Sequence, residues 1–180
     1  MSIFLIIVSI LFWIIAFVCL YGRQTIAPAF SYLAMLMLSF AKENGYPIIP
    51  LNTTILIGWL VMTMVVMLSA MLQPEEIRRQ IRGMTYLIGG AVVGMVLGLL
   101  GFSIGDDLNL RYGLMISATA LGTALGFLLY TNTPDGRPVK PGSGVFFRYL
   151  LAKGFPTAIT VMQLGVVLVL LIALKNVNAL

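Results

Sequence analysis

The 180-residue chain has no histidine, one cysteine and very few charged residues. Histidine is the commonest metal ligand, the usual proton carrier near neutral pH and an axial ligand in many haem proteins. Its absence therefore argues against metal, haem and histidine-based chemistry, and we expect no metal and no cofactor. Cys19 has no second cysteine in the chain, which excludes an intrachain disulfide.

The scarcity of charge also bounds the class of protein. Charged residues make up 9% of the chain and hydrophobic residues 60%, whereas a soluble domain carries about 25% charged residues. So few charges cannot cover a surface that faces water, and no polar segment is long enough to form a soluble domain. We expect a single integral membrane domain over residues 1–180, with no role for nucleic acid.

The long apolar runs predict the fold class. A membrane-spanning helix needs about 20 mostly apolar residues, and six segments meet or approach that length. We predict an all-α polytopic transmembrane helix bundle with six spans, at residues 3–21, 25–41, 53–72, 84–104, 112–130 and 155–174. The second segment is the weakest, because it is short and contains Pro28, although proline is tolerated in the first turn of a helix.

The basic residues predict the orientation. In a six-span arrangement, eight of the eleven Lys and Arg residues follow the first, third and fifth spans. Cytoplasmic loops carry the excess of Lys and Arg, so we expect both termini on the non-cytoplasmic side, in a bacterial inner membrane. Anionic lipid headgroups are the expected partners of the basic residues at the cytoplasmic membrane edge: Arg78, Arg79, Arg82, Arg148 and Lys153.

Two local signals predict helix starts. Asn52 precedes the third span and is the type of residue that caps a helix N-terminus. Pro74, Glu75 and Glu76 fit a first helical turn, since proline is preorganised there and the helix dipole favours acids. We expect the helix that begins near Pro74 to run directly into the fourth span.

Small residues recur every fourth position in the fourth and fifth spans. Such positions share one face of a helix, and small faces allow transmembrane helices to approach closely. The loop between the two spans is short, so we expect an antiparallel hairpin packed through these residues: Gly90, Gly94, Gly98, Ala118, Gly122 and Gly126. A face buried against a second copy or a partner subunit, and a smooth wall along a narrow pathway, are the alternatives.

The predicted spans contain no Asp, Glu, Lys or Arg, so their polar groups are uncharged. These groups either form hydrogen bonds between helices or line a route for a small uncharged solute. Gln163 carries the largest polar side chain at depth. We name four candidates for a substrate path: Gln163, Thr119, Thr123 and Ser117.

Three functions are compatible with these observations. The first is a passive or partner-energised transport or channel unit for a small uncharged solute, as a homo-oligomer or within a larger membrane complex. The second is a non-transporting structural or assembly subunit, for which an exposed apolar or glycine-lined groove is expected. The third, an enzyme acting on lipid headgroups, would require Glu75, Glu76 and Asp135 to meet Arg137 and Lys140. Without histidine or a charged residue in the predicted spans, we expect no enzyme.

Overall fold

The computed structural model describes residues 2–43, 46–47, 51–79, 82–101 and 108–177, with side chains described up to residue 169. These residues are almost entirely helical. The elements are α1 (Ser2–Gly22), α2 (Ala27–Phe40), β1 (Lys42–Glu43), β2 (Tyr46–Pro47), α3 (Thr53–Met71), α4 (Glu75–Arg79), α5 (Met84–Leu100), α6 (Leu108–Thr131), α7 (Gly144–Tyr149), the π-helical turn η2 (Leu150–Gly154) and α8 (Phe155–Val177). The strands β1 and β2 form a two-residue antiparallel pair.

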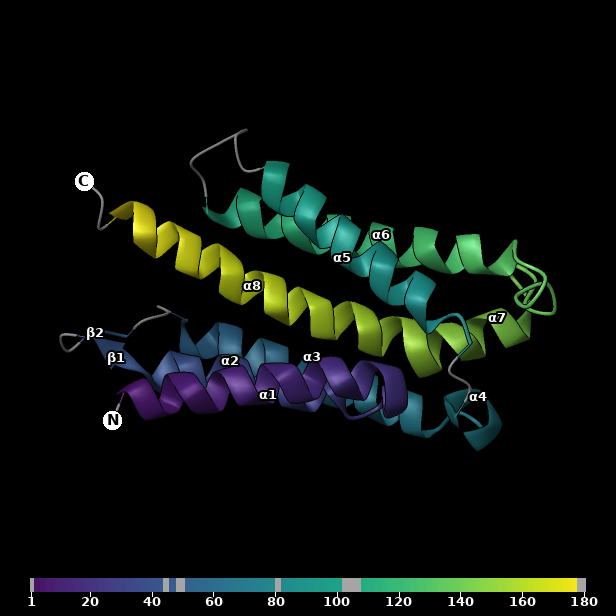
Figure 1. The fold of residues 1–180 in the computed structure, drawn as a ribbon, viewed down its shortest axis with the longest axis horizontal. Helices are drawn as coiled ribbons and strands as arrows, with labels where there is room; N and C mark the ends of the chain where they lie inside the picture. The colour runs from purple at the N-terminus through teal and green to yellow at the C-terminus, as the bar shows by residue number, and fades with distance from the viewer. Residues whose placement is uncertain (1, 44–45, 48–50, 80–81, 102–107, 178–180) are drawn as a thin grey trace.

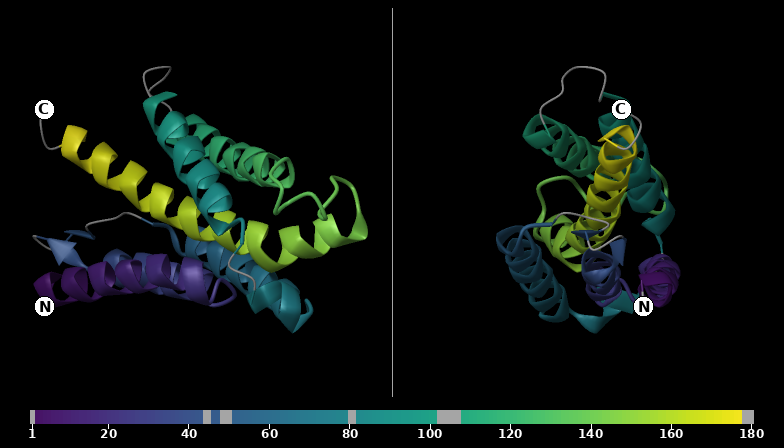
Figure 2. Two further views of the ribbon diagram at one scale, coloured as in Figure 1. Left: turned by 45° about the vertical axis from the view of Figure 1, so that its right-hand side comes forward. Right: turned by 90° about the vertical axis from the view of Figure 1, so that its left-hand side faces the viewer.

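The apolar helices run back and forth between two ends of the bundle (Figure 1). Both termini lie at one end, and α4 and α7 lie at the other. Helix α8 runs between two layers, with α1, α2 and α3 on one side and the α5–α6 hairpin on the other (Figure 2). It contacts α2, α3, α5 and α6, so it forms the centre of the fold.

Four helical segments are long and apolar enough to cross a membrane by length and composition. They are Ile3–Gly22, Thr53–Met71, Leu110–Thr131 and Gly144–Val169. The chain thus has the apolar helices of a membrane protein. The central position of the last segment is reflected in its burial, since 83% of its most apolar 18-residue stretch is buried, against 17% of the corresponding stretch of the first.

The other two predicted spans are shorter in the structure than in the prediction. Helix α2 has 14 residues and α5 has 17, which at 1.5 Å per residue gives lengths of about 21 and 26 Å. Both are less than the roughly 30 Å of a hydrocarbon core. Pro28 lies in the first turn of α2, as expected. Residues 102–104, the predicted end of the fourth span, lie outside the described residues.

Two predicted segments continue differently in the structure. The last predicted span, 155–174, starts where α8 starts, but α7, η2 and α8 follow one another without a break, so the continuous helix begins at Gly144. Arg148 and Lys153, which were expected at the membrane edge before this span, therefore lie inside the continuous helix. The helix near Pro74 does not continue into the next span either. Gly83 precedes α5 with a φ of 81°, a left-handed conformation that glycine adopts readily.

The N-cap prediction for α3 is confirmed. The Asn52 side chain accepts a hydrogen bond from the backbone N–H of Thr54 at 3.4 Å. The start of α7 has a similar cap, in which the Ser143 hydroxyl accepts from the N–H of Phe146 at 3.1 Å. Each cap satisfies a backbone donor that the helix itself leaves unpaired.

Candidate functional site

The α5–α6 contact is made by backbone rather than by side chains. A Cβ atom added to Gly90 would collide with the carbonyl oxygen of Gly122, and one added to Gly94 would collide with that of Ala118. The same holds for Gly126 against the carbonyl oxygen of Tyr86. The small residues therefore lie in the seam between the two helices, where any larger side chain would force them apart.

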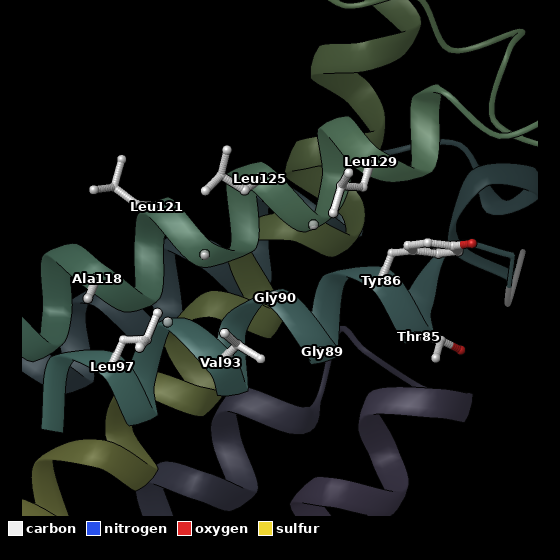
Figure 3. A pocket seen from close by; sticks show the side chains of 13 residues that line it. Thr85, Tyr86, Gly89, Gly90, Val93, Leu97, Ala118, Leu121, Leu125 and Leu129 are labelled. Carbon is white, nitrogen blue, oxygen red and sulfur yellow. The ribbon is translucent and has the colours of Figure 1, made fainter. Parts of the chain in front are cut away.

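On its outer side, the same hairpin has an apolar groove of about 600 Å³. Its floor includes glycines of both helices, and its rims carry exposed leucines and one exposed valine (Figure 3). Leu121, Leu125 and Leu129 stand on the α6 side and are 60–65% exposed. Val93 and Leu97 stand on the α5 side. Gly89 also lines the groove, and a Cβ atom added there would meet nothing within 4 Å.

Gln163 lies in the interior and joins three helices. It is 1% exposed. Its amide nitrogen donates to the Thr63 hydroxyl of α3 at 2.8 Å. Its amide oxygen accepts from the Ser31 hydroxyl of α2. We call Ser31, Gln163 and Thr63 the polar bridge.

The other candidates for a substrate path are not part of the polar bridge. Thr119 is fully buried, and its hydroxyl donates to the Met115 carbonyl oxygen one turn earlier, at 2.7 Å. Thr123 bonds in the same way to Thr119 at 2.8 Å. Ser117 is exposed and donates to the Leu114 carbonyl oxygen at 3.1 Å. Within the described part of the chain, these three side chains donate to backbone oxygens of their own helix and none bonds to Gln163, so the structure does not gather the four into one polar path.

Lys153 is the feature that the sequence analysis missed. It was predicted to contact lipid headgroups, but its side chain is fully buried in η2. The prediction failed because the helix start was placed after this residue. Among the described atoms its ammonium nitrogen has no hydrogen-bond partner. It lies 4.9 Å from the centre of the Tyr149 ring, within the range of a cation–π contact.

The surroundings of Lys153 are aromatic. The rings of Phe127 and Tyr149 stack at 5.1 Å between centroids, and Tyr130 lies 5.9 Å from Tyr149. The Tyr149 hydroxyl donates to the carbonyl oxygen of Arg82. The cluster thereby ties α6, α7 and the start of α5 together at one end of the bundle. Thr157, one turn after Lys153, is also fully buried, with a hydroxyl that lacks a partner among the described atoms.

The remaining predicted headgroup contacts are accessible. Arg79, Arg82 and Arg148 are exposed, and Arg78 is half-buried. The ion pair between Arg79 and Glu75 has an N–O distance of 2.5 Å and lies at the surface, where such pairs contribute little to stability.

Comparison of the chain with models of known protein families, with curated proteins and with solved structures finds no match.

Proposed function

We propose that this chain is a non-transporting assembly subunit of a membrane protein complex, which holds one transmembrane helix of a partner in the α5–α6 groove. The carrying observation is that groove: it is apolar, open to the outside and floored by glycine. This is the surface expected of an assembly subunit. The proposal assigns no catalytic role to the chain.

The shape of the groove supports a helix as its occupant. Its lining extends from Thr85 to Leu97 on α5, a length of about 18 Å at 1.5 Å per residue. Transmembrane helices associate through close packing, and a floor without side chains allows a partner backbone to approach. The rims of leucine and valine supply the side chains against which such a helix would pack.

The polar interior supports the absence of transport. A route for an uncharged solute was expected along Gln163 and the threonines. Gln163 instead uses both ends of its amide within the bundle. Thr119 and Thr123 use their hydroxyls within α6. Gln163 joins α8 to α2 and α3, and the two threonines bond within their own helix, so each of these groups already has a partner inside the bundle.

Filling the groove tests the proposed contact. In Gly89→Leu the new side chain enters the groove without touching the α5–α6 seam, since the space around Gly89 is open. Gly58→Leu on α3 is the matched control, because Gly58 is exposed, has the same open surroundings and lies outside the groove residues. We expect a photo-crosslinker at Val93 to give a discrete protein adduct in native membranes, which Gly89→Leu abolishes and Gly58→Leu preserves.

The same experiment can refute the proposal. A crosslinker at Val61, which is 54% exposed on α3, reports contact with lipid alone. If Val93 yields only the lipid adducts seen at Val61, the groove binds no helix.

Water access to position 163 tests the claim that the chain transports no solute. In Gln163→Cys, with Cys19→Ala, we expect no labelling by impermeant thiol reagents, and labelling from either side would favour a solute route instead.

A further inference from the structure

A polar cavity of about 540 Å³ lies at the end of the bundle that carries α4. It is formed by the turn between α1 and α2 and by α4, two segments about fifty residues apart in the sequence. The residues that line it are Gly22, Arg23, Gln24, Thr25, Glu75, Arg78 and Arg79. Unlike the α5–α6 groove, it presents mostly polar surface, so its occupant must be polar or charged.

One buried donor at this cavity lacks a hydrogen-bond partner, and a nearly buried amide lies beside it. The amide is that of Gln24, whose side chain lines the cavity and is 2% exposed. The Nε atom of Arg78 is buried and has no partner among the described atoms. Buried polar groups are normally hydrogen-bonded, and an unpaired one costs free energy. The Arg78 Nε–H group can only donate a hydrogen bond, which points to an occupant that accepts one.

The charge of the cavity further limits the chemical class of its occupant. Glu75 pairs with Arg79, so these two charges offset each other. Arg23 and Arg78 then leave a net positive charge over the cavity, next to the Gln24 amide and the Thr25 hydroxyl. Guanidinium groups form strong, often bidentate hydrogen bonds with phosphate oxygens. We propose that this cavity binds a phosphate group, carried either by a phospholipid headgroup or by a small soluble phosphate.

The position of the cavity makes both sources reachable. It lies where the apolar helix α1 ends, the depth at which the phosphates of a bilayer are found if α1 crosses the membrane. Basic pockets at helix ends are known to hold anionic headgroups. The cavity is also open to the surrounding water, which gives a free phosphate ester the same access.

Two binding measurements on the full chain separate the sources. In the first, native mass spectrometry counts lipids retained after release from nanodiscs that contain equal amounts of phosphatidylglycerol and phosphatidylcholine. In the second, melting temperatures in detergent are compared between inorganic phosphate and chloride at equal ionic strength. Both use wild type, Arg78→Gln, Arg23→Gln and Arg137→Gln. Arg137 is the control, since it is an exposed loop arginine outside the cavity residues.

We expect Arg78→Gln and Arg23→Gln to reduce binding about fivefold or more, the effect of one basic residue near an anionic surface, while Arg137→Gln leaves it unchanged. Loss of phosphatidylglycerol retention identifies a lipid headgroup. Loss of phosphate-specific stabilisation without any lipid preference identifies a soluble phosphate. The proposal fails if neither ligand is preferred, or if Arg137→Gln weakens binding as much as Arg78→Gln, since surface charge alone would then explain it.

Gln24→Leu gives a sharper test that loss of folding cannot mimic. The substitution replaces a nearly buried polar side chain by an apolar one of similar size, so we expect the protein without ligand to keep the stability of wild type. If the amide donates to the phosphate, ligand binding falls nonetheless. Unchanged binding in Gln24→Leu together with unchanged binding in Arg78→Gln would overturn the assignment.

Discussion

Two contacts hold the bundle together by opposite means. In the α5–α6 seam, glycines remove side chains so that backbone meets backbone. Around α8, side chains fill the space instead, most of them apolar, and the polar bridge connects α8 to α2 and α3. In lipid, burial from water does not drive helices together, which leaves close packing and polar contacts as the available forces. This chain uses close packing in the α5–α6 half and polar contacts in the half where α8 meets α2 and α3.

The difference predicts how each half responds to substitution. A seam made of backbone has no side chain that can move aside, so it is intolerant of even one methyl group. A polar bridge is made of side chains that have alternative partners. The Ser31 hydroxyl also reaches the Pro28 carbonyl oxygen at 3.0 Å, and the Thr63 hydroxyl donates to the Trp59 carbonyl oxygen at 2.7 Å. We therefore expect the seam to fail sharply and the bridge gradually.

The largest effect is expected from Gly90→Ala. The added Cβ atom would collide with the Gly122 carbonyl oxygen, and we expect a loss of about 3 kcal/mol, at the upper end for overpacking. Gly89→Ala is the matched control on the adjacent residue, where a Cβ atom meets nothing. Because alanine is a better helix former than glycine, the control should be stabilised by about 0.5–1 kcal/mol. Unfolding in detergent micelles measures both, and equal effects would refute the backbone seam.

Lys153→Met probes the α8 half and is expected to change stability in the opposite direction. Methionine keeps the length of the side chain and removes an ammonium group that has no hydrogen-bond partner among the described atoms. We expect a gain of about 1–2 kcal/mol, since an unpaired buried polar group costs about that much. The same unfolding assay checks it, with Arg148→Met, an exposed neighbour, as the control near zero. A clear loss of stability would mean that the Tyr149 contact outweighs the burial of charge.

The seam glycines and Lys153 show which parts of the structure could be predicted from the sequence and which could not. The spacing of small residues predicts the seam, because a face repeated every four residues and a short connection constrain two helices to pack together. The burial of Lys153 was out of reach for a physical reason. The segment from Gly144 to Gly154 carries Arg148 and Lys153, so the predicted span was started after it. The stacking of Phe127 of α6 on aromatic rings of α7 joins residues that are remote in the sequence, and no local pattern indicates it.

The polar residues of the spans show a second limit. Composition identifies Gln163 as the largest polar group at depth, but its partners Ser31 and Thr63 lie 132 and 100 residues away in the chain. A residue pattern within one helix carries no information on such a pairing. The cavity at Arg23 and Arg78 was missed for the same reason, as its two segments are remote in sequence.

Gln163→Leu is expected to have a smaller effect than either substitution above. It breaks both contacts of the bridge but leaves Ser31 and Thr63 with backbone acceptors. Hydrogen bonds between membrane helices are worth about 0.6 kcal/mol on average and up to about 1.7, so we expect a loss of about 1 kcal/mol in the unfolding assay. A double-mutant cycle with Thr63→Val isolates the bridge. A coupling energy near zero would show that the contact contributes nothing to stability.

The smallest effect is expected from Thr119→Val. This substitution tests whether the α5–α6 half depends on polar contacts as the α8 half does. Thr119 is as fully buried as any residue of the polar bridge, but its hydroxyl bonds to the Met115 carbonyl oxygen within its own helix. That carbonyl oxygen is already available to the helical backbone, and valine has nearly the same shape as threonine. The hydroxyl therefore joins no two helices, and we expect a change of less than about 0.5 kcal/mol. A loss as large as that of Gln163→Leu would mean that the hydroxyl serves a second helix, and the seam would then depend on polar contacts as the α8 half does.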